Sequence, residues 1–381
     1  MSRIGCFDSA RGLASIAVVF GHFLLAFDLY GAVRWIHYSP LHIVYDGFAA
    51  VSFFFVLSGF ILSLKYFNSP CKRFDLFTYI SYAVKRVLRI YPLYIFIIVI
   101  SLLLKVHFFT KIETTPSLSL WLQSMWTEAA SFSYFFSKFY FIPRRSSFVP
   151  QAWTLGIELL FSLFVPFVVL AVKRNVLVTV FIISCSVFYT TTGVFAFHFL
   201  TGIMLACYFE KIRKIMDTFS RGSKLTFLAA SVGLYTIRHT FPEYLSILGV
   251  TNIFIENDKF IWIITGIGAS GILASIANSE ILNKILNHKW LLFAGKISYS
   301  LYLCHMIIFV LIMPKIINFL NLNFGINSPF IVIVTSFISV ITLIFIFSWG
   351  SHRLIEKPFI QLGKIFGNFV NARSRSNPDL L

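Results

Sequence analysis

Long apolar runs alternate with short polar segments along the whole chain. About 20 apolar residues are needed to cross a hydrocarbon core of about 30 Å as an α-helix. Ten runs approach or exceed this length, although the fifth to seventh are short and their ends are poorly marked. The pattern therefore predicts an all-α integral membrane bundle of about ten transmembrane helices. The predicted spans are 12–30, 44–66, 92–109, 152–172, 176–192, 194–210, 225–241, 260–277, 291–313 and 329–350.

Composition supports a membrane protein. The chain is 58% hydrophobic and only 12% charged, with a mean hydropathy of +0.83, whereas soluble domains have about 25% charged residues. The formal net charge of +17 is compatible with nucleic-acid binding, but the cations lie in short clusters between apolar runs. We therefore expect a lipid bilayer and no nucleic acid as partner. The five cysteines have no metal-ligand spacing, so no metal site is predicted.

The charge distribution also predicts the topology. Most of the 32 Lys and Arg residues fall in the N-terminal segment and in the loops on its side of the predicted spans. Such loops mark the cytoplasmic side, so both termini are expected there. The longest loop, 110–151, then lies outside. It contains Trp121, Trp126 and an aromatic run from Phe132 to Phe141, which predicts either a cover over a cavity or an aromatic belt at the membrane surface.

His22 stands in the middle of the first span. A helix advances about 1.5 Å and turns about 100° per residue, so eleven residues carry His22 roughly 16 Å past Arg11 and back to nearly the same face. An ionisable residue near the bilayer midplane is a functional-site hypothesis. A neutral imidazole can act there as a general base on a hydroxyl or as a nucleophile that carries an acyl group. The alternative is a structural hydrogen bond between helices.

Glu158 lies about two turns into the fourth span from its outer end. A carboxylate at that depth requires a partner. We expect it to take part in catalysis, either by orienting His22 or by binding a polar acceptor. The alternative is an ion pair or hydrogen bond that only fixes helix packing.

Arg86 and Arg89 belong to a basic run at the inner end of the third span. Three residues apart, they share a face if the run is helical. Such a pair can clamp phosphate groups, so Arg86, Arg89 and Arg11 are the predicted contacts for a phosphate-bearing donor. A positively charged cytoplasmic loop without a ligand explains the run equally well.

The ninth span carries a polar stripe from Ile297 to His305. We expect Tyr302 and His305 to contact the substrate, while interhelical hydrogen bonding is the alternative for every member of the stripe. His198 in the sixth span has little polar sequence around it and is assigned to packing.

Six motifs, in order, resemble the acyltransferase-3 family of multi-pass membrane O-acyltransferases in its stand-alone form. The likeness extends from Phe7 to Phe359. One departure is Ser52, which stands where many relatives carry an acid. The motifs are Phe7-Asp8-Ser9-Ala10-Arg11-Gly12 with ten residues between Arg11 and His22, Val51 to Phe60, Arg86 to Pro92, Trp153 to Glu158, Ile297 to His305 and Ile355-Glu356-Lys357-Pro358.

This resemblance implies transfer of an acyl group, usually acetyl, from cytoplasmic acyl-CoA to a hydroxyl of a saccharide on the far side. It implies that His22 is the catalytic histidine and that Arg11 belongs with it. Acyl-CoA is then a co-substrate and no cofactor is bound. We expect an acyltransferase-3-like transmembrane domain over 1–365 without a fused esterase-like domain, and a disordered, polar cytoplasmic tail over 366–381.

The expected location is the bacterial inner membrane. A transporter or flippase for a lipid-linked sugar would share the spans and the midplane polar residues. Such proteins often have two repeated halves with broken helices, and the sequence has no such repeat. A purely structural membrane scaffold is disfavoured by the alignment of Arg11 with His22 and by Glu158.

Overall fold

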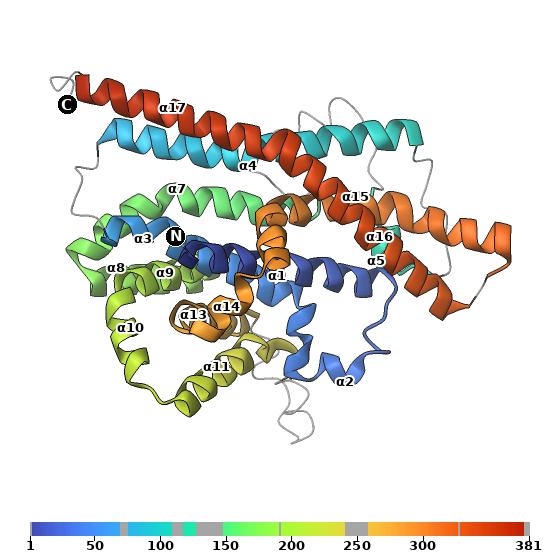
Figure 1. The fold of residues 1–381 in the computed structure, drawn as a ribbon, viewed down its shortest axis with the longest axis horizontal. Coiled ribbons are helices and arrows are strands. Elements are labelled where there is room, and N and C mark those ends of the chain that lie inside the picture. The colour runs from blue at the N-terminus through green and yellow to red at the C-terminus, as the bar shows by residue number, and fades with distance from the viewer. Residues whose placement is uncertain are drawn as a thin grey trace. The chain divides into compact units, whose positions relative to one another are not determined.

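The computed structural model describes residues 2–68, 75–108, 117–126, 148–189, 192–240, 258–326 and 328–376. These residues are almost entirely helical and include no strand (Figure 1). The chain divides into two compact units. Unit 1 comprises Met1–Val18, Val33–Arg73 and Leu160–Ser298, and unit 2 comprises Val19–Ala32, Phe74–Leu159 and Tyr299–Leu381.

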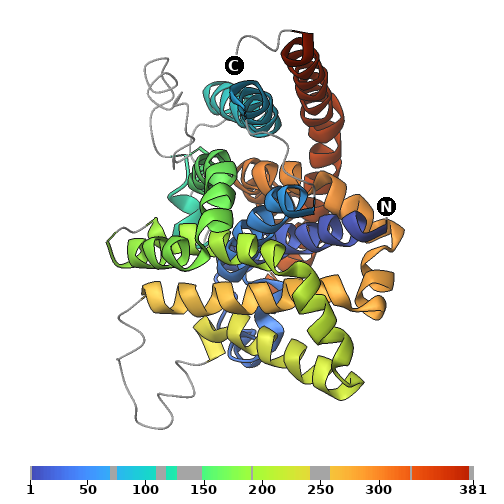
Figure 2. The same ribbon diagram turned by 90° about the vertical axis from the view of Figure 1, so that its left-hand side faces the viewer.

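Unit 1 is built around α3, α9 and α13, with α13 lying between α9 and α11 (Figure 2). Glycines allow α3 and α9 to touch along their backbones: a Cβ added at Gly202 would collide with the Val56 carbonyl oxygen, and one at Gly59 with that of Phe199. Close contact at small residues is a common way for membrane helices to associate. The helices that lie wholly in unit 1 are α2 (Arg34–His37), η1 (Pro40–Val44), α3 (Gly47–Asn68), α8 (Val176–Tyr189), α9 (Gly193–Cys207), α10 (Phe209–Thr218), α11 (Arg221–Tyr235), α13 (Asp258–Asn278) and α14 (Glu280–Leu286).

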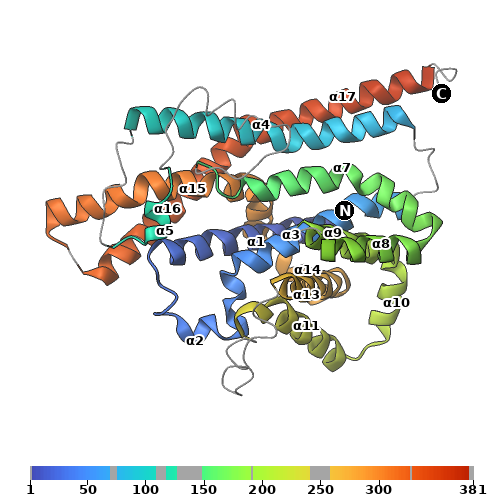
Figure 3. The same ribbon diagram turned by 180° about the vertical axis from the view of Figure 1, so that it is seen from behind.

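Unit 2 contains α4 (Leu76–Phe108), α5 (Leu120–Gln123), α16 (Pro329–Ser351), the π-helical turn η2 (His352–Glu356) and α17 (Lys357–Ser376). Helices α4 and α17 run side by side (Figure 3). The unit boundary falls within three longer helices, which contribute residues to both units. They are α1 (Ser2–Ala26), α7 (Ala152–Arg174) and α15 (Lys289–Phe324).

Each of the ten predicted spans overlaps a helix. Within the described residues, seven helices are long and apolar enough to cross a membrane, or eight if α9 and α10, bent by 71° at their junction, form one span. Helices α8 and α11, which fall in the short predicted spans, have 14 and 15 residues. The predicted fold class, an all-α membrane bundle, is confirmed.

Several predicted boundaries differ from the structure, and α4 and α17 are two examples. Helix α4 begins at Leu76 and continues through Pro92, because proline is tolerated inside membrane helices where neighbouring groups satisfy the freed backbone carbonyl. Helix α17 continues to Ser376, well into the predicted tail. Its Gly367 packs against Lys85 of α4, and the Ser81 hydroxyl donates to the Gly367 carbonyl oxygen at 3.5 Å. Residues 377–381 lie outside the described chain.

Part of the predicted outer loop is described. Ser119 caps α5 by accepting from the Leu122 amide at 3.4 Å, and its own amide donates to the carbonyl oxygen of Ala26 at the end of α1 at 2.8 Å. Lys105 of α4 donates to the carbonyl oxygen of Trp126. The loop is thus attached to two helices of unit 2. The aromatic run from Phe132 to Phe141 lies outside the described residues.

Candidate active site

Helices α1 and α15 pack together in a parallel register. In unit 1, a Cβ added at Gly12 would lie 2.5 Å from the backbone nitrogen of Gly295, and the Ser15 hydroxyl donates to the Ser298 carbonyl oxygen at 3.0 Å. In unit 2, His22 meets His305. The paired polar residues are 283 positions apart in both units, so each unit contains the same register of the two helices.

The central contact of unit 2 joins two histidines. Nδ1 of His22 lies 2.8 Å from Nε2 of His305. The ring centroids are 5.1 Å apart and the planes differ by 17°, so with the nitrogens this close the rings meet edge to edge. His305 is fully buried, and its Nδ1 lies 3.3 Å from the Leu301 carbonyl oxygen. Two residues predicted for the site from separate spans are therefore in direct contact.

Sequence reasoning named both histidines but missed their pairing. The signal was present as a pattern shared by the two helices, Gly-x2-Ser-x6-His. It occurs at Gly12, Ser15 and His22, and again at Gly295, Ser298 and His305. Small residues let two helices approach closely, so identical spacing of a close contact, a polar contact and a histidine is typical of two helices that pack in parallel register.

Trp121 covers His22. The two rings are nearly parallel, with centroids 5.4 Å apart and an interplanar angle of 23°, which is within the range of offset stacking. Trp121 lies on α5 in the predicted outer loop.

Glu158 contacts Arg86 rather than His22. Oε1 of Glu158 on α7 lies 3.0 Å from Nη2 of Arg86 on α4. The side chains are 23% and 10% exposed, so the pair is largely buried. The position beside His22 belongs to His305.

The three predicted phosphate contacts are divided between the units. Arg11, in unit 1, pairs with Asp8 one turn earlier, with Nη1 and Oδ1 3.1 Å apart. Arg86 and Arg89, in unit 2, lie one turn apart on α4, as the spacing predicts. Arg86 is buried and Arg89 is half-buried.

Tyr302 belongs to a buried polar group formed by α7 and α15. Its hydroxyl lies 2.7 Å from Oγ1 of Thr154, and Oγ1 donates to the Gln151 carbonyl oxygen at 2.9 Å. The Gln151 side chain donates to the Leu303 carbonyl oxygen at 2.9 Å. Sequence reasoning missed Thr154 as a partner of Tyr302 and missed Gln151 altogether, because neither is ionisable.

The N-terminal part of the polar stripe makes interhelical hydrogen bonds. Ser300 donates to Oε2 of Glu356 at 2.7 Å, and Nδ1 of His352 lies 2.9 Å from the same oxygen. The Tyr299 hydroxyl donates to the Ile90 carbonyl oxygen at 2.6 Å. Glu356 lies in the π-helical turn η2, and such turns are frequent at functional sites.

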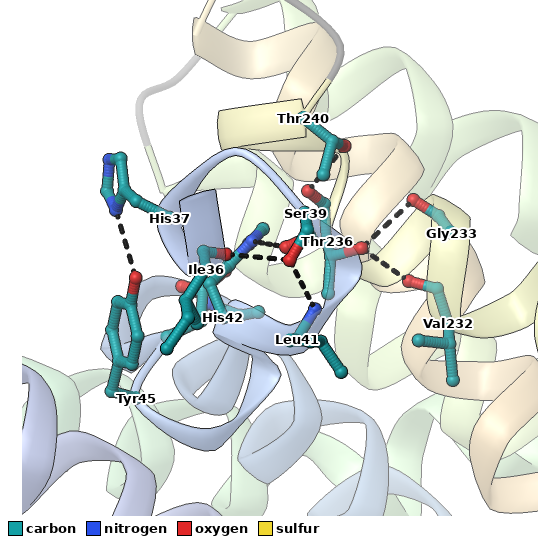
Figure 4. Close-up of polar contacts among 12 residues, drawn as sticks. Ile36, His37, Ser39, Leu41, His42, Tyr45, Val232, Gly233, Thr236 and Thr240 are labelled. Carbon is teal, nitrogen blue, oxygen red and sulfur yellow. Dashed lines mark hydrogen bonds and ion pairs between the residues drawn. The ribbon is translucent and has the colours of Figure 1, made fainter. Parts of the chain in front are cut away.

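A second histidine cluster lies in unit 1, near α2 and η1 (Figure 4). His37 lies close to His239, with ring centroids 4.3 Å apart, and its Nδ1 is 3.3 Å from the Tyr45 hydroxyl. Nε2 of His42 lies 3.1 Å from Oδ2 of Asp46. Burial, aided by the charge of His42, lowers the pKa of His37 from its usual value. Burial also lowers the pKa of His239, to about 4.

The described residues contain no group of three or more His, Cys, Asp and Glu side chains placed to hold a metal ion. His198, which the sequence assigned to packing, is fully buried. Its Nε2 lies 2.8 Å from the Trp262 carbonyl oxygen, and a Cβ at Gly266 would collide with its ring.

Comparison with known proteins finds similarity over most of the chain. A family model for the acyltransferase-3 type, described as an acyltransferase domain, matches residues 4–349. The O-acetyltransferase OatA of Staphylococcus aureus strain MRSA252 is 27% identical over 382 residues, which cover 92% of this chain and 59% of that protein. OatA of strain NCTC 8325 is 27% identical over 318 residues, which cover 76% of this chain and 50% of that protein. The chain thus matches only 50% to 59% of the length of these relatives. No solved structure matches it.

Proposed function

The chain belongs to the acyltransferase-3 family, and from this premise we propose that it is a membrane O-acetyltransferase. The acyl group, acetyl in the first instance, comes from cytoplasmic acyl-CoA and goes to a hydroxyl of a saccharide on the outer side. The observation that carries the proposal is the pair of imidazoles inside the helical bundle, His22 against His305 at 2.8 Å. Two imidazoles in hydrogen-bond contact can take a proton from a hydroxyl group and hold it, without a water molecule as the proton acceptor.

The reaction needs one base and one leaving group. His22 takes the proton of the acceptor hydroxyl, whose oxygen bonds to the thioester carbonyl carbon. The carbon–sulfur bond breaks, and the thiolate receives the proton from His22 and leaves as the CoA thiol. In the covalent variant of this route, His22 first takes the acyl group from sulfur and then passes it to the hydroxyl.

The donor is proposed to enter from the cytoplasmic side. Its phosphates lie near Arg89 and Arg86 of α4, since guanidinium groups bind phosphate through paired hydrogen bonds. Arg86 also holds Glu158, so Arg89 supplies the more accessible of the two α4 cations. The flexible arm of the CoA carries the thioester toward His22.

The acceptor is proposed to enter from the outer side, beneath Trp121 and beside Tyr302. A tryptophan ring and tyrosine and threonine hydroxyls suit a saccharide, which offers an apolar ring face and many hydroxyl groups. Glu158 then acts by fixing α7, which carries Thr154, against α4. We propose that both termini lie in the cytoplasm, because the loops on their side of the spans carry most of the positive charge, and that the membrane is the bacterial inner membrane.

The test uses purified protein in lipid vesicles with radiolabelled acetyl-CoA and a bacterial glycan fraction as acceptor. We expect label to pass to the glycan with wild type and not with His22→Ala. The variant His198→Gln, a buried histidine outside the site, should transfer label at nearly the wild-type rate per folded molecule. Glycan that moves across vesicles without label transfer would support a flippase and overturn the proposal, as would normal transfer by His22→Ala.

A further inference from the structure

The hydrogen bonds of His305 determine which of its nitrogens carries a proton. A neutral imidazole has one N–H donor and one bare nitrogen that accepts. Nδ1 of His305 faces the Leu301 carbonyl oxygen at 3.3 Å, and a carbonyl oxygen can only accept. Nδ1 of His305 is therefore the protonated nitrogen, and its Nε2 is bare.

The same reasoning then applies to His22. Its Nδ1 lies 2.8 Å from the bare Nε2 of His305, so Nδ1 of His22 must donate. A neutral imidazole carries one N–H proton, and in His22 that proton is on Nδ1. Nε2 of His22 therefore carries no proton and presents its lone pair. The partner of one ring nitrogen fixes the state of the other in this way in many histidine sites.

We propose that His305 is a positioning residue that holds His22 in the Nδ1-protonated tautomer, so that Nε2 is the atom that meets the substrate. The role rests on the proposed function. It differs from the substrate contact that the sequence predicts for His305, because His305 acts through His22.

The surroundings of His305 suit a positioning role. Its ring is fully buried and lies edge-on to Tyr302 and Phe309, with centroids 6.2 and 5.7 Å away. The parallel register of α1 and α15 in unit 2 brings it to His22 edge to edge. A ring so confined can orient its neighbour without itself reaching a substrate.

His305 has a second role in both routes of the reaction, direct transfer and transfer through an acyl group on His22. When Nε2 of His22 accepts the hydroxyl proton, positive charge develops on that ring, and its Nδ1–H bond to His305 strengthens. When Nε2 instead takes the acyl group and the carbon–sulfur bond breaks, the Nδ1 proton passes to Nε2 of His305. The thiolate accepts the proton of the acceptor hydroxyl and leaves as the CoA thiol, and the hydroxyl oxygen bonds to the acyl carbon. The bond from that carbon to Nε2 of His22 then breaks, and the borrowed proton returns from His305 to Nδ1 of His22.

The first test reads the tautomer directly. Protein labelled with ¹⁵N-histidine is measured by NMR in detergent or lipid, and the signals of His22 and His305 are assigned from the spectra of His22→Asn and His305→Gln. We expect a protonated Nδ1 and a bare Nε2 on His22. A protonated Nε2 on His22 would overturn the proposal, whether or not the protein transfers acyl groups, so this result is independent of the proposed function.

The second test compares two substitutions at His305. Glutamine places an accepting oxygen near the position of the imidazole Nε2, whereas leucine cannot accept. We expect His305→Leu to reduce kcat by about 10²- to 10³-fold, with the KM for acetyl-CoA unchanged. His305→Gln should recover at least about tenfold of that loss, with a changed pH profile of kcat, because glutamine cannot take the proton.

The matched control is His198→Gln, which should leave the pH profile unchanged. Equal activities of His305→Leu and wild type would overturn the positioning role while leaving the proposed function intact. Equal losses in the leucine and glutamine variants, with identical pH profiles, would also overturn it, because they would show that packing alone matters. If the leucine variant does not fold, the tautomer of His22 measured in the wild-type protein still supports or overturns the positioning role of His305.

Discussion

The guanidinium of Arg86 and the carboxylate of Glu158 form an ion pair across 72 residues of sequence, with Nη2 and Oε1 3.0 Å apart. The pair joins α4 to α7 within unit 2. An ionised carboxylate within a span requires such a partner, and the arginine is equally in need of one. Two residues that the sequence assigned to separate tasks, donor binding and catalysis, therefore stabilise the scaffold together.

Breaking this ion pair should be costly for the fold. Removal of either partner takes away a largely buried ion-pair contact of 3.0 Å, so Arg86→Ala and Glu158→Ala should each lower the free energy of unfolding by about 2–4 kcal/mol. The double variant should lose less free energy of unfolding than the two single variants lose together. Thermal unfolding in detergent, followed by tryptophan fluorescence, measures these losses. Additive losses would show that the pair is not coupled.

Arg89→Ala is the matched control for this cycle, since Arg89 lies one turn away on the same helix. Its stability should change by less than about 1 kcal/mol, the usual range for a half-buried surface charge. Its apparent KM for acetyl-CoA should rise several-fold, because Arg89 is a proposed phosphate contact. An unchanged KM would remove that role.

The contact of Gly12 with Gly295 should tolerate no larger side chain. Gly295→Val would drive a side chain into the backbone of Asp8, which should separate α1 from α15 and reduce both the folded yield and acyl transfer more than tenfold. Gly233→Ala, at a helical glycine with no atom within 4 Å of an added Cβ, should be neutral or stabilising by up to about 1 kcal/mol. Wild-type yield and activity of Gly295→Val would contradict the packing.

Trp121 should affect the reaction through its ring. Trp121→Ala removes an aromatic contact worth about 0.5–1.5 kcal/mol, so kcat/KM for the acceptor should fall by about 2- to 10-fold, whereas Trp121→Phe should keep most of the rate. Leu120→Ala is the control, because that neighbouring side chain is 83% exposed. Kinetics with varied acceptor will measure the effect, and equal rates for the alanine and phenylalanine variants would argue against stacking.

Acid should destabilise unit 1 through His239. Burial, then the charges of His37, His42 and Arg238, lowers its pKa to about 4, although Asp46 opposes them. The unfolded chain binds this proton near about pH 6.5, so the stabilisation is complete above that pH and is lost as pH falls toward about 4. We expect His239→Gln to reduce the fall in Tm between pH 7.5 and 4.5, corresponding to on the order of 2 kcal/mol. An identical pH dependence in the variant and wild type would contradict this.

Helical periodicity made several elements predictable. The apolar run around His22 is a single helix, so Arg11 and His22 do lie on one helix, and each of the ten predicted spans contains one. The third span was predicted to begin at Pro92, but α4 begins at Leu76, because proline is tolerated inside a membrane helix where neighbouring groups satisfy the freed backbone carbonyl. The ends of the fifth to seventh spans were poorly marked because these apolar runs are short for a hydrocarbon core of about 30 Å. The sequence also does not mark the 71° bend between α9 and α10.

The sequence by itself determined the all-α membrane class, the family and the candidacy of His22 and His305, because hydropathy, helical spacing and ordered motifs are local properties of the chain. Only the tertiary structure decided the partners. His22 on α1 meets His305 on α15, and Glu158 on α7 meets Arg86 on α4. Local spacing places a side chain on a face, but which face packs against which depends on residues far apart in the chain.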